Sequence, residues 1–185
     1  MALTKTPVCD FGKKAEDFKL KSIENKIISL NDVKGEKATL IMFICNHCPY
    51  VKAIIRDLAK DCNELKKDGI NSIAIMSNDT KNYPEDSFDN MIKFAKANDF
   101  GEMNYLIDET QEIARKYGAV CTPDFFGYNK DLKLQYRGRF RELKDLKPVS
   151  GGDSDLKIAM KMISETQAGP KEQIPSMGCN IKWFN

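Results

Sequence analysis

The segment ATLIMFICNHCPYV, residues 38–51, joins an apolar run to a pair of cysteines and then to a proline. Residues 38–44 are apolar apart from one threonine and rich in strand-forming side chains, which predicts a central strand covered on both faces. Pro49 suits the first turn of a helix, where its missing N–H leaves no hydrogen bond unmade. The apolar residues that follow have helical spacing and predict a helix that stops at Gly69: Val51, Ile54, Ile55, Leu58, Cys62 and Leu65.

Residues 70–77, INSIAIMS, predict a second buried strand. Residues 38–77 therefore form a strand–helix–strand unit, which has the right-handed crossover of a parallel sheet. The remaining pattern predicts, in chain order, a helix over 86–98, a strand at 104–107, a helix over 112–117, a hairpin that turns at 129–131, and a last helix capped by Asp153.

A parallel crossover followed by a β-hairpin, with helices on both faces, is typical of one architecture. It predicts an α/β protein of thioredoxin-like fold with a central mixed sheet. We expect this domain to span residues 1–167. Residues 168–185 are expected to form an irregular tail that packs on the same domain, with Trp183 as its anchor.

The composition excludes several classes of partner. The 29 basic and 27 acidic residues leave a net charge of +2, and their interspersed signs indicate neither a nucleic-acid surface nor a membrane surface. The longest apolar run, residues 38–45, is far shorter than the roughly 20 residues needed to span a bilayer. The first residues lack the apolar core of a secretory signal, so we expect a cytoplasmic protein. In a reducing compartment a Cys-x-x-Cys pair is more often catalytic or metal-binding than structural.

The cysteine pair lies where the first long strand ends and its helix begins. A helix N-terminus carries unpaired N–H groups and a partial positive charge, so it favours an anion such as a thiolate. We expect Cys45 to be the attacking sulfur with a lowered pKa, and Cys48 to resolve the mixed disulfide. His47, the only histidine, is expected to support the thiolate and to make the disulfide more oxidising.

Residues outside the motif complete the predicted site. Asn46 lies inside the motif and is expected to contact substrate. The chemistry also needs backbone opposite the dithiol, and Thr122-Pro123, just ahead of an apolar strand, is the candidate for it. Asn78 and Asp79 follow the end of a buried strand, the side where open α/β sheets place their sites, and are expected to line it.

The other four cysteines have different expected roles. Cys62 is in phase with the core residues of its helix, and Cys9 is expected to be an incidental thiol. Cys121 lies beside Thr122-Pro123, and its side chain could point toward the dithiol or away from it. For Cys179 we favour a small buried filler; the alternative is a third thiol that takes the disulfide outward.

Several segments resemble one family. Residues 14–48, from KAEDF to CNHC, resemble the opening of thioredoxin-fold proteins of the alkyl hydroperoxide reductase and thiol-specific antioxidant class. SNDTKNYPEDS, YLIDETQEIARKYGAVCTPDFF and the ending GCNIKW are similar to its peroxiredoxin-like branch. The resemblance covers nearly all of residues 10–183. It implies the thioredoxin fold, a cis peptide at Thr122-Pro123, and Cys45 as the nucleophile.

The chain departs from the pattern of the peroxidases in this class. They carry Pro-x-x-x-Thr-x-x-Cys, with the reactive cysteine at the position of Cys48. Here Ile41 stands in place of the proline and Cys45 in place of the threonine. The activating arginine of the peroxidases falls where this chain has Thr122-Pro123. These positions argue against the usual peroxide pocket.

The chain also departs from thioredoxins, which keep a buried acid six residues before the first cysteine. This chain has Thr39 there. We therefore expect His47, water or a carboxylate such as Asp79 to carry the proton.

We predict a thiol–disulfide oxidoreductase without organic cofactor or bound metal, which acts on protein or small-molecule disulfides and is recharged by a reducing partner. The first alternative is a thiol-dependent peroxidase with antioxidant function, which would use Cys45 or Cys48. The second is a metal-binding module that holds copper or zinc by Cys45, His47 and Cys48. Zinc prefers four ligands, which this motif alone does not supply.

Overall fold

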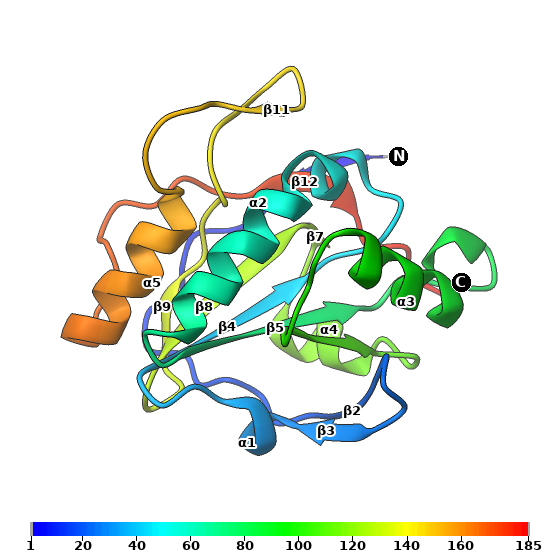
Figure 1. Ribbon diagram of the computed structural model, residues 1–185, viewed down its shortest axis with the longest axis horizontal. Helices are drawn as coiled ribbons and strands as arrows, with labels where there is room; N and C mark the ends of the chain where they lie inside the picture. Colours follow the sequence, from blue (N-terminus) through cyan, green and yellow to red (C-terminus); the bar gives the residue numbers. More distant parts are fainter. Residues whose placement is uncertain (1, 185) are drawn as a thin grey trace.

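The apolar residues 38–43 form strand β4 inside a seven-stranded mixed sheet (Figure 1). This computed structural model describes residues 2–184. The strand order is β3-β2-β6-β5-β4-β8-β9; β5 is parallel to β4 and to β6, and the other pairs are antiparallel. The strands are β2 (Lys19–Ser22), β3 (Ile27–Ser29), β4 (Ala38–Phe43), β5 (Ile70–Met76), β6 (Asn104–Ile107), β8 (Asp124–Asn129) and β9 (Leu134–Tyr136).

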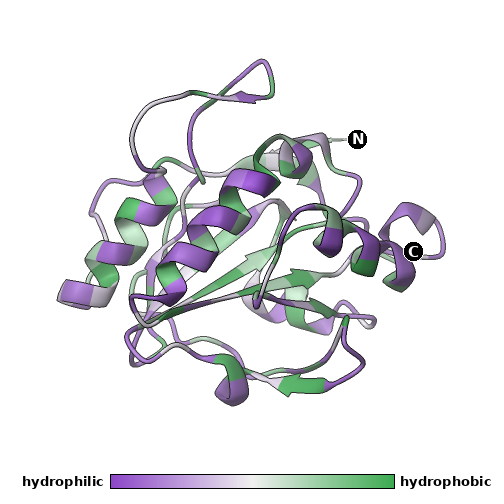
Figure 2. Cartoon of the chain, in the orientation of Figure 1, coloured by the Kyte–Doolittle hydropathy of each residue, from purple (hydrophilic) through white to green (hydrophobic). Residues whose placement is uncertain are grey.

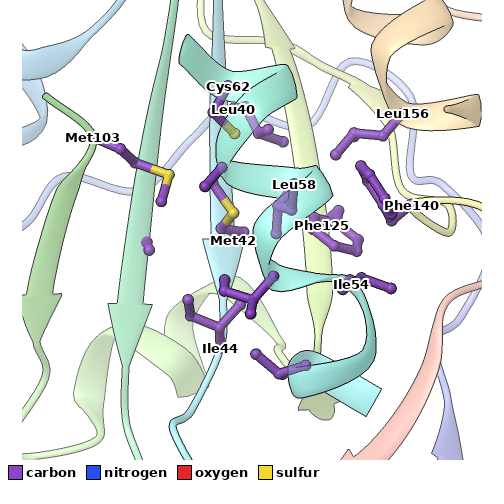
Figure 3. Packing of buried hydrophobic residues seen from close by; sticks show 14 of the residues in the cluster. Leu40, Met42, Ile44, Ile54, Leu58, Cys62, Met103, Phe125, Phe140 and Leu156 are labelled. Carbon is purple, nitrogen blue, oxygen red and sulfur yellow. The ribbon is translucent and has the colours of Figure 1, made fainter. Parts of the chain in front are cut away.

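Side chains of β4 alternate between two cores because successive residues of a strand point to opposite faces. Leu40 and Met42 enter one core, which α2, α3 and α5 cover; Ile41 and Phe43 enter the other, which α1 and α4 cover. Figure 2 shows the apolar residues gathered on the sheet and on the inner faces of the helices. Figure 3 shows Leu40 and Met42 packed with side chains of α2 such as Leu58. The helices are α1 (Leu30–Val33), α2 (Pro49–Lys66), α3 (Phe88–Ala97), α4 (Glu112–Tyr117) and α5 (Asp155–Thr166), with a 3-10 turn η1 (Pro84–Asp86).

The order of helices and strands confirms the predicted α/β architecture, with one correction at a helix cap. We expected Asp153 to cap the last helix, but Ser154 is the N-cap of α5, and its side chain accepts the Lys157 N–H at 3.0 Å. Asp153 instead pairs with the Lys157 ammonium group at 2.9 Å. Within residues 2–184, none of the helices has both the length and the apolar character that crossing a membrane requires.

The C-terminal tail is less irregular than expected. Residues 177–180 form strand β12, which lies in a second sheet of order β1-β12-β7 and pairs antiparallel with both neighbours. Trp183 is half-buried against the second core, and the Arg115 guanidinium lies 4.3 Å from its ring centre. The strands outside the main sheet are β1 (Leu3–Lys5), β7 (Cys121–Thr122), β10 (Leu143–Lys144), β11 (Lys147–Pro148) and β12 (Met177–Asn180).

Glycine at position 178 allows β12 to lie against β7. A Cβ atom there would lie 2.0 Å from the Thr122 carbonyl oxygen, so any side chain forces the two strands apart. We expect Gly178→Ala to lower the free energy of unfolding by about 2–3 kcal/mol through overpacking. Met177→Ala, on the same strand but exposed, should change it by less than about 0.5 kcal/mol. Chemical denaturation measures both; equal effects of the two substitutions would contradict the close approach.

Candidate active site

The two motif cysteines lie at the start of α2, next to β12 (Figure 1). Pro49 is the first helical residue, so Cys48 is the N-cap and Cys45 lies one turn before the helix. Cys48 makes no regular side-chain capping hydrogen bond, but the Val51 N–H faces its sulfur. Both cysteines are fully buried, and all six cysteines are free thiols.

The N-terminus of α2 favours ionisation of the Cys48 thiol. Hydrogen bonding from the Cys45 thiol and from the backbone N–H groups of Cys179 and Val51 outweighs burial and lowers the pKa of Cys48 to about 5. The Thr122 carbonyl oxygen, 3.1 Å from Cys48 Sγ, accepts a hydrogen bond from the neutral thiol and opposes its ionisation. We give the N–H groups more weight, because several donors and the helix dipole oppose a single carbonyl.

The pKa of Cys45 is raised, whereas that of Cys48 is lowered. Its hydrogen bond to Cys48, its burial and the nearby Asp86 carboxylate all raise the pKa of the Cys45 thiol well above its ordinary value. Thr122 Oγ1 lies 3.4 Å from Cys45 Sγ. The prediction that Cys45 carries the lowered pKa is therefore corrected: the helix begins four residues after Cys45, so its free N–H groups reach Cys48 instead.

His47 pairs with a buried carboxylate that the sequence analysis missed. His47 Nδ1 lies 2.7 Å from Asp86 Oδ2, and the Asp86 side chain is fully buried. Hydrogen bonding to Asp86 outweighs burial and raises the pKa of His47 above its ordinary value. The imidazole also stacks on the Tyr83 ring, with 5.7 Å between ring centres.

Asp86 is held by two further donors. The Asn46 backbone N–H donates to Asp86 Oδ1 at 2.8 Å, and the Asn78 amide donates to Asp86 Oδ2 at 2.8 Å. The carboxylate thus connects the motif to the loop after β5. The only sequence signal for it was its place within SNDTKNYPEDS, because nothing local links Asp86 to a motif about 40 residues earlier.

Three residues predicted to contact substrate have other neighbours. Asn46 is buried; its amide group donates to the Glu85 carbonyl oxygen and accepts from the Tyr105 hydroxyl. The Asn78 amide donates a hydrogen bond to the Asp86 carboxylate. Asp79 accepts a hydrogen bond from the Lys81 N–H at 2.9 Å, within its own loop. The carboxylate beside the dithiol, which we expected to be that of Asp79, is that of Asp86.

The possible metal ligands differ from the expected set. Within residues 2–184, ligand atoms of Cys45, His47 and Asp86 lie within 4.8 Å of one another, and Cys48 is not in this group. The two Asp86 oxygens already accept from Asn46, Asn78 and the His47 ring. These contacts use three of the roughly four acceptor positions of the carboxylate, and the group offers three ligands where zinc prefers four. We therefore place the metal-binding alternative below the redox proposal.

The peptide bond between Thr122 and Pro123 is cis, as the resemblance implied. Thr122 contacts both motif cysteines, through its hydroxyl and its carbonyl oxygen. The next residue, Asp124, forms a buried ion pair with Arg137 at 2.9 Å, which fixes the start of β8. Thr122 is therefore placed against the dithiol, and the cis bond joins it to Pro123.

The remaining cysteines are all placed by the structure. Cys62 is buried in the core, as predicted, and Cys9 is half-buried near the N-terminus. Cys121 Sγ donates to the Pro123 carbonyl oxygen at 3.6 Å. Cys179 is buried on β12 in the same cluster as Cys45 and Cys48, and its thiol and backbone N–H help to lower the pKa of Cys48.

Two solved structures are similar to this chain over nearly its whole length. An uncharacterized conserved protein from Geobacillus kaustophilus is 39% identical, with a TM-score of 0.93, covering 100% of this chain and 97% of that chain. A hypothetical protein from Sinorhizobium meliloti 1021 is 35% identical, with a TM-score of 0.89 and coverage of 98% of both chains. No curated protein matches the chain.

More distant structures carry the fold. The thioredoxin domain of a thiol-disulfide oxidoreductase from Bacteroides vulgatus is 18% identical, with a TM-score of 0.58, covering 69% of this chain and 86% of that chain. At that identity the likeness shows the fold alone, and it confirms the predicted thioredoxin-like fold. The model of the AhpC/TSA family matches residues 11–137. The chain belongs to the AhpC/TSA family.

Proposed function

We propose that this protein is a thiol–disulfide oxidoreductase that exchanges disulfides through Cys45-Asn46-His47-Cys48. One observation carries the proposal: Cys48 at the N-cap of α2 and Cys45, three residues earlier, are buried in one cluster, and both sulfurs contact Thr122. The thiolate is the reactive form of cysteine, and a neighbouring thiol is what resolution of a mixed disulfide requires.

The proposed reaction begins at the Cys48 thiolate. Its sulfur attacks one sulfur of the substrate disulfide; the substrate S–S bond breaks, the Cys48–substrate bond forms, and the other substrate sulfur leaves as a thiolate. Cys45 then loses its proton and attacks Cys48 Sγ. That step forms the Cys45–Cys48 disulfide and releases the second substrate thiolate, so the substrate is reduced by two electrons and the protein oxidised by two.

Proton transfer from Cys45 requires an acceptor. Ligand atoms of His47 and Asp86 lie within 4.8 Å of its sulfur, and Asp86 holds the ring. We assign the proton to this pair, with His47 as acceptor when its ring is neutral and Asp86 as the residue that positions it.

Burial of the dithiol restricts access. Neither Cys45 nor Cys48 is exposed, so an external disulfide reacts only after a local opening. The cover includes β12, which pairs with β7 through only two residues. Both protein and small-molecule disulfides remain substrates in the proposal.

The proposal includes no organic cofactor, because thiol–disulfide exchange needs only sulfur nucleophiles. A reducing partner must return the Cys45–Cys48 disulfide to the dithiol after each turnover. A cytoplasmic location, with its reducing thiol pools, is part of the proposal.

A thiol-dependent peroxidase is the second candidate, and the burial of Cys48 favours it. A peroxide is small enough to reach a thiolate that a protein disulfide reaches only after opening. The Cys48 thiolate would attack the terminal peroxide oxygen; the O–O bond breaks, water or an alcohol leaves, and Cys48 becomes a sulfenic acid. The Cys45 thiol would then attack Cys48 Sγ, which forms the disulfide and releases a second water. Ile41 and Thr122-Pro123, which replace family peroxidase residues, argue against it.

The first test is reduction of a model protein disulfide, that of insulin, with dithiothreitol as the electron source. We expect the wild type to accelerate the reaction and Cys48→Ser to abolish the acceleration, because the thiolate is lost. Cys62→Ser is the matched control, since Cys62 is on the same helix but in the core. It should leave the rate within about twofold. Rapid consumption of hydrogen peroxide with no effect on insulin would reject the oxidoreductase in favour of the peroxidase.

The second test concerns the proton acceptor. His47 is the only histidine, so its ring resonances titrate without overlap in proton NMR. Asp86 raises the pKa of His47, so Asp86→Asn should move the midpoint down, toward or below the ordinary 6.5. The ion pair stabilises the fold below the unfolded-state pKa, and this stabilisation is lost as the pH rises through the folded-state pKa.

Asp79→Asn is the control for that titration, because Asp79 bonds within its own loop. It should leave the His47 midpoint in place. Equal midpoints in the wild type and Asp86→Asn would show that the buried carboxylate does not govern the imidazole.

A further inference from the structure

A third thiol meets the dithiol from the C-terminal tail. Cys179 belongs to the same buried cluster as Cys45 and Cys48, and its thiol and backbone N–H both favour ionisation of Cys48, which lowers the pKa of that thiol. Cys48 therefore shares its buried surroundings with two other thiols, Cys45 from its own loop and Cys179 from β12. Cys179 is separated from Cys48 by about 130 residues of chain, so the fold and not local sequence makes this contact.

Backbone pairing fixes the position of Cys179. It lies directly opposite Thr122 in the antiparallel pairing of β12 with β7, and opposite Leu3 in the pairing with β1. Thr122 is also the residue that contacts both motif cysteines. Pairing on both sides therefore holds Cys179 in register with the dithiol.

The residues before Cys179 allow β12 to lie close to Thr122 and Pro123. Gly178 lets the strand come within contact of the Thr122 carbonyl, where a Cβ atom would lie 2.0 Å away. The Ser176 hydroxyl donates to the Pro123 carbonyl oxygen at 2.7 Å, and the Ser176 N–H donates to the Thr6 hydroxyl. These contacts hold β12 against Thr122 and Pro123, next to the dithiol.

We propose that Cys179 is a third redox cysteine, which forms a disulfide with Cys48 in exchange with Cys45. This inference rests on the proposed function. In the oxidised protein the Cys179 thiolate attacks Cys48 Sγ; the Cys45–Cys48 bond breaks, the Cys48–Cys179 bond forms, and Cys45 leaves as a thiolate. The proton lost by Cys179 is taken up by Cys45, so no outside oxidant or reductant is consumed.

The same geometry lets Cys179 resolve a mixed disulfide at Cys48. The Cys179 thiolate attacks Cys48 Sγ and releases the substrate sulfur as a thiolate, as Cys45 does from the other side. The disulfide then lies between α2 and the tail strand rather than within the motif. This outcome replaces the filler expected for Cys179, although the side chain is buried as a filler would be.

Cys121 provides the comparison within the same sheet. It is buried on β7, opposite Asn180 of β12, but its thiol donates to the Pro123 carbonyl oxygen at 3.6 Å. It is not a member of the buried cluster of described residues that contains Cys45, Cys48 and Cys179. We assign it no part in the exchange.

The test uses the full chain with Cys45→Ser, which leaves Cys48 and Cys179 in place. The reduced variant is treated with glutathione disulfide, and the products are mapped by mass spectrometry of proteolytic fragments. We expect a Cys48–Cys179 disulfide and loss of the transient glutathione adduct at Cys48. A stable Cys48–glutathione adduct with a free Cys179 would overturn the inference.

Two double variants are the matched controls. Cys45→Ser with Cys179→Ser should retain glutathione on Cys48, because no thiol then resolves the adduct. Cys45→Ser with Cys121→Ser should still form the Cys48–Cys179 disulfide. If the adduct is lost equally in both, another thiol resolves it and Cys179 is not the third redox cysteine.

The wild type separates this inference from the proposed function. With the same reagent it should form the Cys45–Cys48 disulfide. If it does so while Cys45→Ser yields no Cys48–Cys179 bond, the oxidoreductase stands and the role of Cys179 fails. If the wild type forms no disulfide at Cys48, the proposed function itself fails.

Discussion

Helix α2 begins at Pro49, so the unpaired N–H groups of its first turn face Cys48 and not Cys45. The core holds that start in place, because buried side chains of α2 such as Leu58 pack with Leu40 and Met42 of β4 (Figure 3). An anion at this point is stabilised by the helix, and a thiolate stabilised in the reduced protein makes the corresponding disulfide more oxidising. The Cys48 thiolate stabilises the reduced fold at pH values above the unfolded-state pKa, and this is lost as the pH falls toward about 5.

Two groups of residues surround Cys48, and each has a different role in the proposed chemistry. Cys45, His47 and Asp86 form the side that handles protons, where the carboxylate raises the pKa of both other groups. Thr122 and β12 form the other side, where backbone groups and the Cys179 thiol surround the sulfur. In the proposed mechanism Cys48 therefore remains the sulfur common to every disulfide, and its partner changes.

Much of the fold could be predicted from the sequence because its elements are long and strongly patterned. The apolar run of β4 and the helical spacing from Val51 to Leu65 led directly to the parallel crossover. The cis peptide at Thr122-Pro123 followed from the resemblance, and Thr122 contacts both motif cysteines. The positions of Asp86 and β12 could not be predicted from the sequence. Each belongs to a short segment that contacts residues far away in the chain. The reversal between Cys45 and Cys48 came from the helix start: proline at the first helical position makes the preceding residue, Cys48, the N-cap.

The central claim is that Cys48 is the thiolate of the reduced protein. Ultraviolet absorbance of thiolates, followed against pH in the reduced wild type and in Cys48→Ser, tests it most directly. The account predicts a transition with a midpoint near 5 in the wild type, because hydrogen-bond donors lower the pKa of Cys48 to about 5, and no such transition in Cys48→Ser. A wild type whose thiolates form only near the ordinary value of 9.0 would contradict it, as would an acidic transition that survives in Cys48→Ser.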